Sequence, residues 1–144
     1  ALPVAGRYRW GLVLDAPGRE LFLETDYTRL RQILTNLLTN AIKFTERGRV
    51  TLAVEVGAEQ VGLVVRDTGI GIEPSQLDII FHPFRQATRA GQRAFGGTGL
   101  GLAIVARLTS LIGASISVQS EPGRGSEFRV LLPKAASSGM LLAG

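Results

Sequence analysis

The sequence has no cysteine, a single histidine (His82) and only two lysines among its 144 residues. Without thiols the chain has neither a disulfide framework nor a thiolate metal site, and one imidazole makes a zinc centre a poor interpretation. No apolar run reaches the ~18 residues needed to cross a bilayer. The first residues contain no methionine and no charged-then-apolar signal pattern. We therefore expect a piece of a longer protein that does not itself insert into a membrane.

The composition is typical of one globular domain. Apolar residues make up 45% and charged residues 19% of the chain, which excludes wholesale disorder. The net charge of +4 comes from an arginine-rich set of basic residues and suits phosphate or an acidic partner. Because the arginines are dispersed and no basic run is interleaved with aromatics, nucleic acid is the weaker interpretation.

Hydrophobic periodicity predicts an α/β two-layer sandwich, in which about three helices cover one face of a mixed, mostly antiparallel sheet. The strongest helix follows a cap at Thr25 or Asp26 and continues through Ile42, and shorter helices are expected at 74–80 and 100–112. The expected strands occupy 8–14, 21–24, 50–56, 61–66, 116–118 and 127–132. Residues 81–98 have no clear period and are expected to form a mobile loop. The small residues of 135–144 resemble a linker, which leaves 1–134 as the domain.

A glycine-rich stretch, 96–101, runs directly into the apolar pattern of the last expected helix. Glycines leave backbone N–H groups uncovered, and the positive end of the helix dipole points back at them. This arrangement favours an anion, most plausibly a phosphate. A flexible connector that happens to precede a helix is the alternative.

The long helix carries a polar stripe at Asn36, Asn40 and Lys43, which are spaced to share one flank of the apolar face. Asparagine is a poor helix former, and its amide oxygen is a hard ligand suited to Mg²⁺. Lys43 would add a point charge suited to a terminal phosphate. A solvated flank of an amphipathic helix is an equally good interpretation of the stripe alone.

Asp67 ends a hydrophobic strand and is followed by Gly69 and Gly71. A carboxylate in this position could accept a hydrogen bond from an exocyclic amine, while the glycines let a flat ring approach the backbone. An ordinary Asp-Thr-Gly turn is the alternative. We interpret His82 as a packing or surface residue.

Several common nucleotide and catalytic motifs are absent from the sequence. The glycine spacing is not the dinucleotide fingerprint, no Walker-A lysine–serine pair is present, and the eukaryotic-type kinase set is missing. No Gly-x-Ser-x-Gly motif and no Ser/His/Asp set occurs either. The role of the arginines in the 81–98 loop stays open.

Taken together, these segments resemble the catalytic ATP-binding domain of bacterial sensor histidine kinases, in the superfamily shared with gyrase, MutL and the heat-shock chaperone ATPases. All four family boxes occur in order, and the 120–128 segment also fits. The N box is Asn36-Leu37-Leu38-Thr39-Asn40-Ala41-Ile42-Lys43-Phe44, the first glycine box Asp67-Thr68-Gly69-Ile70-Gly71-Ile72, the F box Phe81-His82-Pro83-Phe84 and the second glycine box Gly97-Thr98-Gly99-Leu100-Gly101-Leu102.

The resemblance implies ATP and Mg²⁺ as cofactors and gives each box a role. Asn40 would hold Mg²⁺ with Asn36 beside it, Lys43 would contact the phosphates, and Phe44 would lie against the adenine. Asp67 would bind the adenine amine, within a box that also contains Gly69, Gly71 and Ile72. The loop 81–98 would be an ATP lid. Phosphate contacts would come from the second glycine box: Gly97, Thr98, Gly99, Leu100 and Gly101.

The implied activity is transfer of the terminal phosphate of ATP to a histidine on a separate dimerisation domain, in two-component signalling. That domain is absent from the chain, and a downstream response regulator or receiver domain would be the next partner. Asn36 stands where hydrolysing relatives carry a general-base glutamate, which favours transfer over hydrolysis. His82 replaces the usual F-box glutamate. We expect a cytoplasmic domain of a membrane-bound bacterial sensor; the alternatives are a non-catalytic nucleotide-binding module, a serine kinase or an ATPase.

Overall fold

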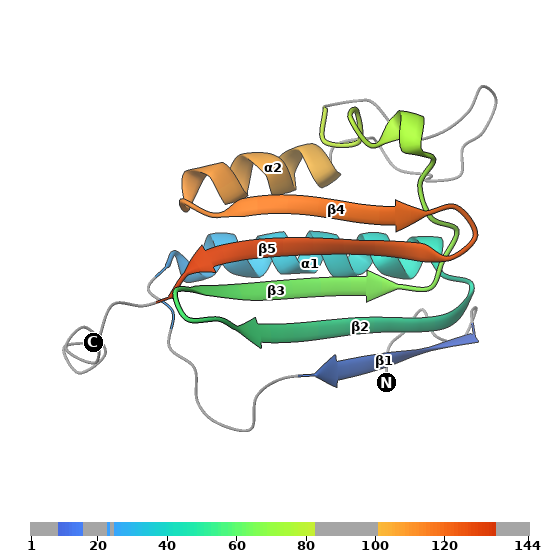
Figure 1. Cartoon of the computed structure of the whole chain (residues 1–144), viewed down its shortest axis with the longest axis horizontal. Helices are drawn as coiled ribbons and strands as arrows, with labels where there is room; N and C mark the ends of the chain where they lie inside the picture. Colours follow the sequence, from blue (N-terminus) through green and yellow to red (C-terminus); the bar gives the residue numbers. More distant parts are fainter. Residues whose placement is uncertain (1–8, 16–22, 24, 83–100, 135–144) are drawn as a thin grey trace.

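The computed structural model describes residues 9–15, 23, 25–82 and 101–134, and for 9–15 it describes the backbone alone. Five strands form one sheet (Figure 1) in the order β1-β2-β3-β5-β4. β1 pairs with β2 in parallel, and the other neighbours are antiparallel, so the expected mixed, mostly antiparallel sheet is confirmed. The strands are β1 (Arg9–Asp15), β2 (Arg47–Val56), β3 (Gln60–Asp67), β4 (Ser115–Glu121) and β5 (Gly125–Pro133).

Helix α1 (Tyr27–Phe44) connects β1 to β2, as a parallel strand pair requires a crossover connection. The Asp26 carboxylate caps its start by accepting a hydrogen bond from the Arg29 backbone N–H at 3.0 Å. Ile33, Leu37 and Ala41 form its buried stripe. The period of the sequence and the cap residue therefore predict this helix correctly.

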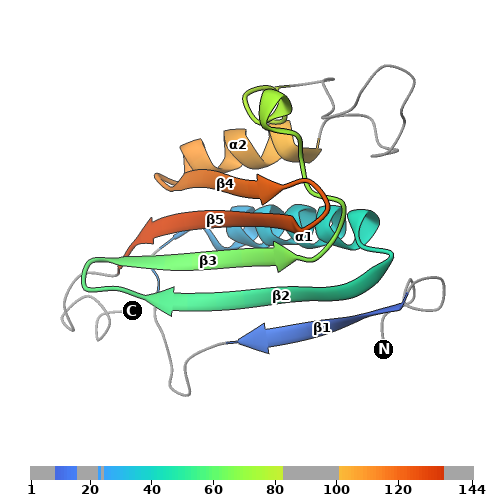
Figure 2. The same cartoon turned by 45° about the vertical axis from the view of Figure 1, so that its right-hand side comes forward.

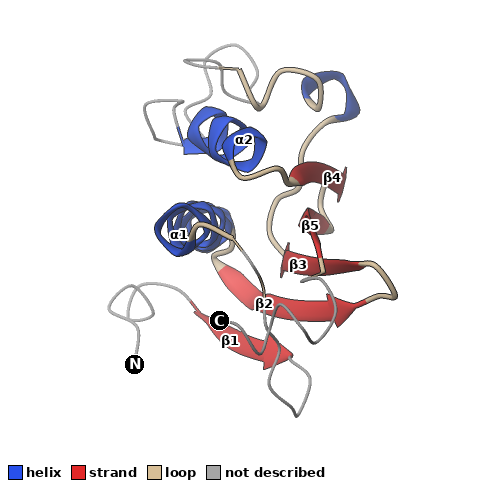
Figure 3. Ribbon diagram, turned by 90° about the vertical axis from the view of Figure 1, so that its left-hand side faces the viewer, coloured by secondary structure: helices blue, strands red, loops and turns tan. Residues whose placement is uncertain are grey.

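Helix α2 (Gly101–Leu111) lies beside α1 on the same face of the sheet (Figure 3). Between these helices and the sheet lies the hydrophobic core, to which β3 and β5 contribute alternate residues such as Val61, Val65, Phe128 and Val130. The ring of Phe81 packs edge-on against Phe128, with centroids 6.2 Å apart. The two-layer arrangement is also visible in the rotated view of Figure 2.

The segment 74–80 differs from the helix that the sequence predicts. It contains only a single 3₁₀ turn, η2 (Pro74–Gln76), followed by further turns. The bonds from Leu77 N–H to the Pro74 carbonyl and from Ile79 N–H to the Gln76 carbonyl close over three residues, so no α-helical ladder develops. The described part of the chain therefore has two α-helices on the sheet, fewer than the three expected.

Other expectations fall on residues that the structure does not describe. These are most of the second strand (21–24), the greater part of the loop 81–98 and the tail 135–144. The closing hairpin is described, and its two strands are longer than the sequence predicts.

The face of the sheet opposite the helices carries an ion-pair cluster formed by Glu55, Arg66, Glu127 and Arg129. Arg66 binds the carboxylates of Glu127 at 2.8 Å and Glu55 at 3.0 Å. Arg129 pairs with the same two carboxylates. We call this side the open face. Among the described residues, no helix is long and apolar enough to cross a membrane.

Candidate functional site

The polar stripe of α1 is present in the structure. Asn36 and Asn40 are half-buried and Lys43 is exposed, along one flank of the buried stripe. The helix repeat separates the two asparagines by one turn, ~6 Å along the axis. No three His, Cys, Asp or Glu side chains come together within the described ranges, so a metal there would depend on amide oxygens and on oxygens of its ligand. The stripe fits a Mg²⁺ that keeps phosphate and water ligands.

The Asp67 carboxylate lies at the end of β3, whose residues 61–65 are all buried. Asp67 is itself only 6% exposed, and its carboxylate accepts a hydrogen bond from the Gly69 N–H at 2.9 Å. Burial raises the pKa of Asp67 above its ordinary value, and backbone hydrogen bonding from Gly69 and Ser126 opposes that rise. A carboxylate has about four acceptor positions, so Asp67 retains capacity for N–H donors of a ligand.

The loop that follows Asp67 is attached to the end of α1. The Ile70 N–H donates to the Phe44 carbonyl at 3.2 Å, and a Cβ on Gly69 would lie 2.2 Å from the same oxygen. Thr68 bonds Arg49 through both its backbone N–H and its side-chain oxygen. The first glycine of this box is therefore required for close packing. It brings the Asp67 loop against the helix that carries the asparagines.

The second glycine of the loop has a different requirement. Gly71 has φ +76°, and a Cβ there would lie 2.1 Å from the Glu121 carbonyl oxygen. The Ile70 carbonyl accepts from the Gly123 N–H at 2.8 Å, and the Ile72 N–H donates to Ser120 Oγ at 2.8 Å. Ile72 is buried in the core. The loop is thus held between α1 and the β4–β5 hairpin.

Ser126 is a member of the site that sequence reasoning did not single out. It is the register partner of Asp67 on the neighbouring strand β5, and it is 8% exposed. Its hydroxyl lies 2.8 Å from the hydroxyl of Ser120. The 120–128 segment fits the family pattern, but only the strand register shows that Ser126 lies beside Asp67.

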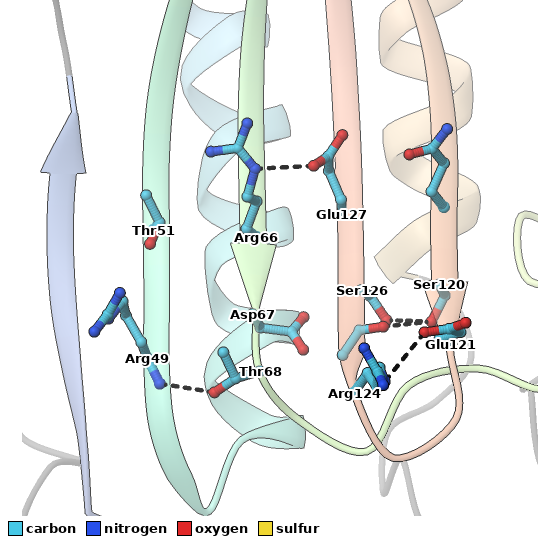
Figure 4. Close-up of a pocket in the computed structure, with 12 residues that line it drawn as sticks. Arg49, Thr51, Arg66, Asp67, Thr68, Ser120, Glu121, Arg124, Ser126 and Glu127 are labelled. Carbon is cyan, nitrogen blue, oxygen red and sulfur yellow. Dashed lines mark hydrogen bonds and ion pairs between the residues drawn. The ribbon is translucent and has the colours of Figure 1, made fainter.

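A pocket of about 470 Å³ opens at this end of the sheet (Figure 4). Asp67, Ser120 and Ser126 line it together with residues of the open face, including Arg66 and Glu127. Its lining lies largely on the open face and does not include Asn36, Asn40 or Lys43, so this pocket is distinct from the space between α1 and the Asp67 loop.

The glycine-rich end of the site is described only at Gly101. This residue begins α2, is exposed, and a Cβ on it would meet no atom within 4 Å. Gly97, Thr98, Gly99 and Leu100, like the arginines of the expected lid, lie outside the described residues. His82 is exposed at the end of the η2 turns.

Comparison with known proteins identifies the family of this chain. The family described as histidine kinase-, DNA gyrase B- and HSP90-like ATPase matches residues 25–136. Sensor histidine kinase RcsC of Escherichia coli K12 is 44% identical over 133 residues, which cover 92% of this chain. The autoinducer 2 sensor kinase/phosphatase LuxQ of Vibrio parahaemolyticus is 47% identical over 115 residues, or 76% of this chain. The chain spans 14% of the length of RcsC and 13% of that of LuxQ.

Solved structures show the same fold. Full-length ShkA in complex with AMPPNP matches 94% of this chain and 28% of its own, with a TM-score of 0.79 and 36% identity. The nucleotide-free catalytic domain of histidine kinase ThkA matches 87% of this chain and 80% of its own, with a TM-score of 0.73 and 30% identity. The chain belongs to the histidine kinase-, DNA gyrase B- and HSP90-like ATPase family, as an ATP-binding catalytic domain of the sensor histidine kinase type.

Proposed function

We propose that this chain binds Mg-ATP between α1 and the Asp67 loop and transfers the terminal phosphate to a histidine of a separate dimerisation domain. The observation that carries the proposal is the attachment of the Asp67 loop to the end of α1 through Ile70 and Phe44. That contact joins an acceptor for an amine to a helix flank that carries Asn36, Asn40 and Lys43.

Asp67 and Phe44 would hold the adenine. The buried carboxylate accepts hydrogen bonds and has spare acceptor positions, which matches the exocyclic amine. Gly69 and Gly71 let the loop pack directly against the carbonyl oxygens of Phe44 and Glu121, which would fix the position of the Asp67 carboxylate relative to α1. Ile72 belongs to the same loop and is part of the buried core beneath it.

Asn40, with Asn36 one turn away, would hold the metal, and Lys43 would contact the phosphates. When bound, Mg²⁺ supplies neutralisation of the charge on the phosphate oxygens. Lys43 is exposed at the last turn of α1, where its ammonium group is free to follow a flexible polyanion. The second glycine box, from Gly97 to Gly101, would donate backbone N–H groups to the phosphates at the start of α2.

Transfer needs positioning and charge neutralisation rather than a covalent intermediate on this chain. The bond between the terminal phosphorus and the bridging oxygen breaks and ADP leaves. A new bond forms from phosphorus to the unprotonated nitrogen of the partner's imidazole, and the proton on the other ring nitrogen then passes to solvent. Asn36 is an amide, which cannot act as the general base that would activate water. The site therefore favours a protein nucleophile over hydrolysis.

The partners follow from this chemistry. The first is the histidine-bearing dimerisation domain of the parent protein, and the second is a response regulator or receiver domain that takes the phosphate onward. RcsC and LuxQ are named as sensor kinases, which supports a place for the whole parent protein in two-component signalling on the cytoplasmic side of a bacterial membrane. The domain itself would cover residues 1–134, with 135–144 as a linker.

Incubation of this chain with γ-labelled ATP, Mg²⁺ and the purified dimerisation domain of the parent tests the proposal. We expect acid-labile label on the dimerisation domain and none on a variant of that domain whose acceptor histidine is replaced by glutamine. Acid-stable label would indicate a serine kinase instead. Free phosphate without labelled protein would indicate an ATPase, and binding without turnover would indicate a regulatory module.

A further inference from the structure

One hydroxyl group, that of Ser120, joins three segments next to Asp67. Ser120 Oγ accepts a hydrogen bond from the Ile72 N–H at 2.8 Å. It also lies 2.9 Å from the Gly125 carbonyl oxygen and 2.8 Å from Ser126 Oγ (Figure 4). A hydroxyl carries one proton and two acceptor lone pairs, so these three contacts use its full capacity.

The direction of each bond follows from the partners. The Gly125 carbonyl can only accept, so the single Ser120 proton is directed to it. The contact between the two serines then requires Ser126 to be the donor. With its only proton directed at Ser120, the Ser126 hydroxyl offers lone pairs alone to any other group.

Two acceptors consequently lie side by side at the end of the sheet. Asp67 and Ser126 are register partners on the neighbouring strands β3 and β5. An amine with two N–H groups satisfies two neighbouring acceptors. A carbonyl in the same position would face both acceptors without a donor, which is costly in a site as buried as this one.

A Ser126 hydroxyl released from Ser120 would change this selection. It could rotate and donate to a purine 6-carbonyl while Asp67 accepts the neighbouring ring N–H. That donor–acceptor pair matches a 6-oxopurine such as hypoxanthine. Ser120 therefore disfavours binding of a 6-oxopurine, because it accepts the hydroxyl proton that Ser126 would otherwise donate to the 6-carbonyl.

We propose that Ser120 is a positioning residue that sets the selectivity of the site for a 6-aminopurine over a 6-oxopurine, acting through the hydroxyl of Ser126. This inference rests on the proposed placement of adenine at Asp67. Ser120 itself does not contact the base in this arrangement; it fixes the hydrogen-bond direction of the residue beside Asp67.

Equilibrium titration with ATP and with ITP, which differ at the 6-position and at the adjacent ring nitrogen, measures this selectivity directly. We expect Ser120→Ala to lower the ratio of the ITP dissociation constant to the ATP dissociation constant about tenfold, which corresponds to ~1.4 kcal/mol. Most of this change should come from tighter binding of ITP. Ser120→Thr keeps the hydroxyl and should keep the wild-type ratio. Ser117→Ala, on the same strand and exposed, is the matched control and should leave both constants unchanged.

A double-substitution cycle separates selectivity from structural support. In a Ser126→Ala background, Ser120→Ala should no longer change the ratio, because the hydroxyl through which it acts is gone. If Ser120→Ala weakens the binding of ATP and of ITP equally, the inference is overturned and Ser120 only supports the local structure. Where the alanine variant does not fold, Ser120→Cys, a weaker hydrogen-bonding group, should narrow the ratio in the same direction, and an unchanged ratio would overturn the inference.

A different result is expected if adenine does not bind at Asp67. If Asp67→Asn leaves ATP affinity unchanged, adenine does not lie at Asp67 and both proposals fail. If Asp67→Asn weakens ATP binding while the Ser120 variants leave the ratio unchanged, the selectivity inference alone is wrong.

Discussion

Replacement of Asp67 by asparagine should weaken ATP binding by roughly ten- to a hundredfold. A hydrogen bond to a charged group contributes ~1.5–3 kcal/mol, which corresponds to that range. The asparagine side chain has one acceptor oxygen, and the Gly69 N–H, which lies 2.9 Å from the present carboxylate, competes for it. The new amide NH₂ would meet the adenine amine as a second donor. Isothermal titration with the non-hydrolysable analogue AMPPNP avoids turnover during the measurement.

The same substitution should change how stability depends on pH. Burial raises the folded-state pKa of Asp67, so its contribution to stability is fully present below the ordinary value of 3.8 and is lost as pH rises through the raised pKa. Asparagine has no such loss. The free energy of unfolding of Asp67→Asn, relative to wild type, should therefore increase as pH rises from 4 toward 7.

Asp78→Asn is the matched control for the binding measurement. Asp78 is an exposed carboxylate on the turns after η2, and its neutralisation should leave ATP affinity nearly unchanged. Undiminished affinity in Asp67→Asn would refute the adenine assignment. A relative stability that is flat or decreases with rising pH would refute the electrostatic reasoning.

Three further perturbations test other parts of the account. Gly125→Ala should destabilise the fold by ~2 kcal/mol or more beyond Gly123→Ala. Both glycines have positive φ, but only at Gly125 would the new Cβ lie 2.0 Å from the Asp67 carbonyl oxygen. Equal losses of stability in thermal unfolding would contradict this prediction. Asn40→Ala should abolish the Mg²⁺ dependence of ATP binding, and wild-type titrations that are identical with and without Mg²⁺ would rule out the metal role. Burial favours the neutral form of Glu127, but hydrogen bonds from its two arginine partners hold its pKa below the ordinary 4.5, so Glu127→Gln should cost ~1 kcal/mol at pH 7. That cost should vanish as pH falls through the lowered pKa, without a change in ATP affinity; denaturant unfolding at pH 7 and pH 3.5 measures it.

The elements with strong local signals are predicted well from the sequence. The α1 helix has an apolar stripe at helical spacing and a carboxylate cap at Asp26, and both features act within a few residues of each other. The η2 segment is predicted less well. Pro74 suits a helix start, but that preference does not decide whether α-helical bonds follow, and here they close over three residues.

The residues of the candidate site also differ in whether a local sequence pattern predicts them. The residues of the asparagine stripe and Asp67 are visible as motifs because each lies in a short, distinctive segment. The neighbour of Asp67 on the adjacent strand, Ser126, lies 59 positions further along the chain, and only strand register places it there. The role of Ser120 depends on three hydrogen bonds from three segments, which no local pattern encodes.

The central claim is that nucleotide binds between the α1 flank and the Asp67 loop. Backbone and side-chain amide NMR shifts of the labelled chain, recorded during titration with AMPPNP and Mg²⁺, test it most directly. The account predicts the largest changes at the Asn40 side-chain amide and at the backbone amides of Phe44 and Gly69, with little change at Glu55 and Arg129 on the open face. Changes concentrated on the open face, with the Asn40 and Gly69 signals unmoved, would contradict it.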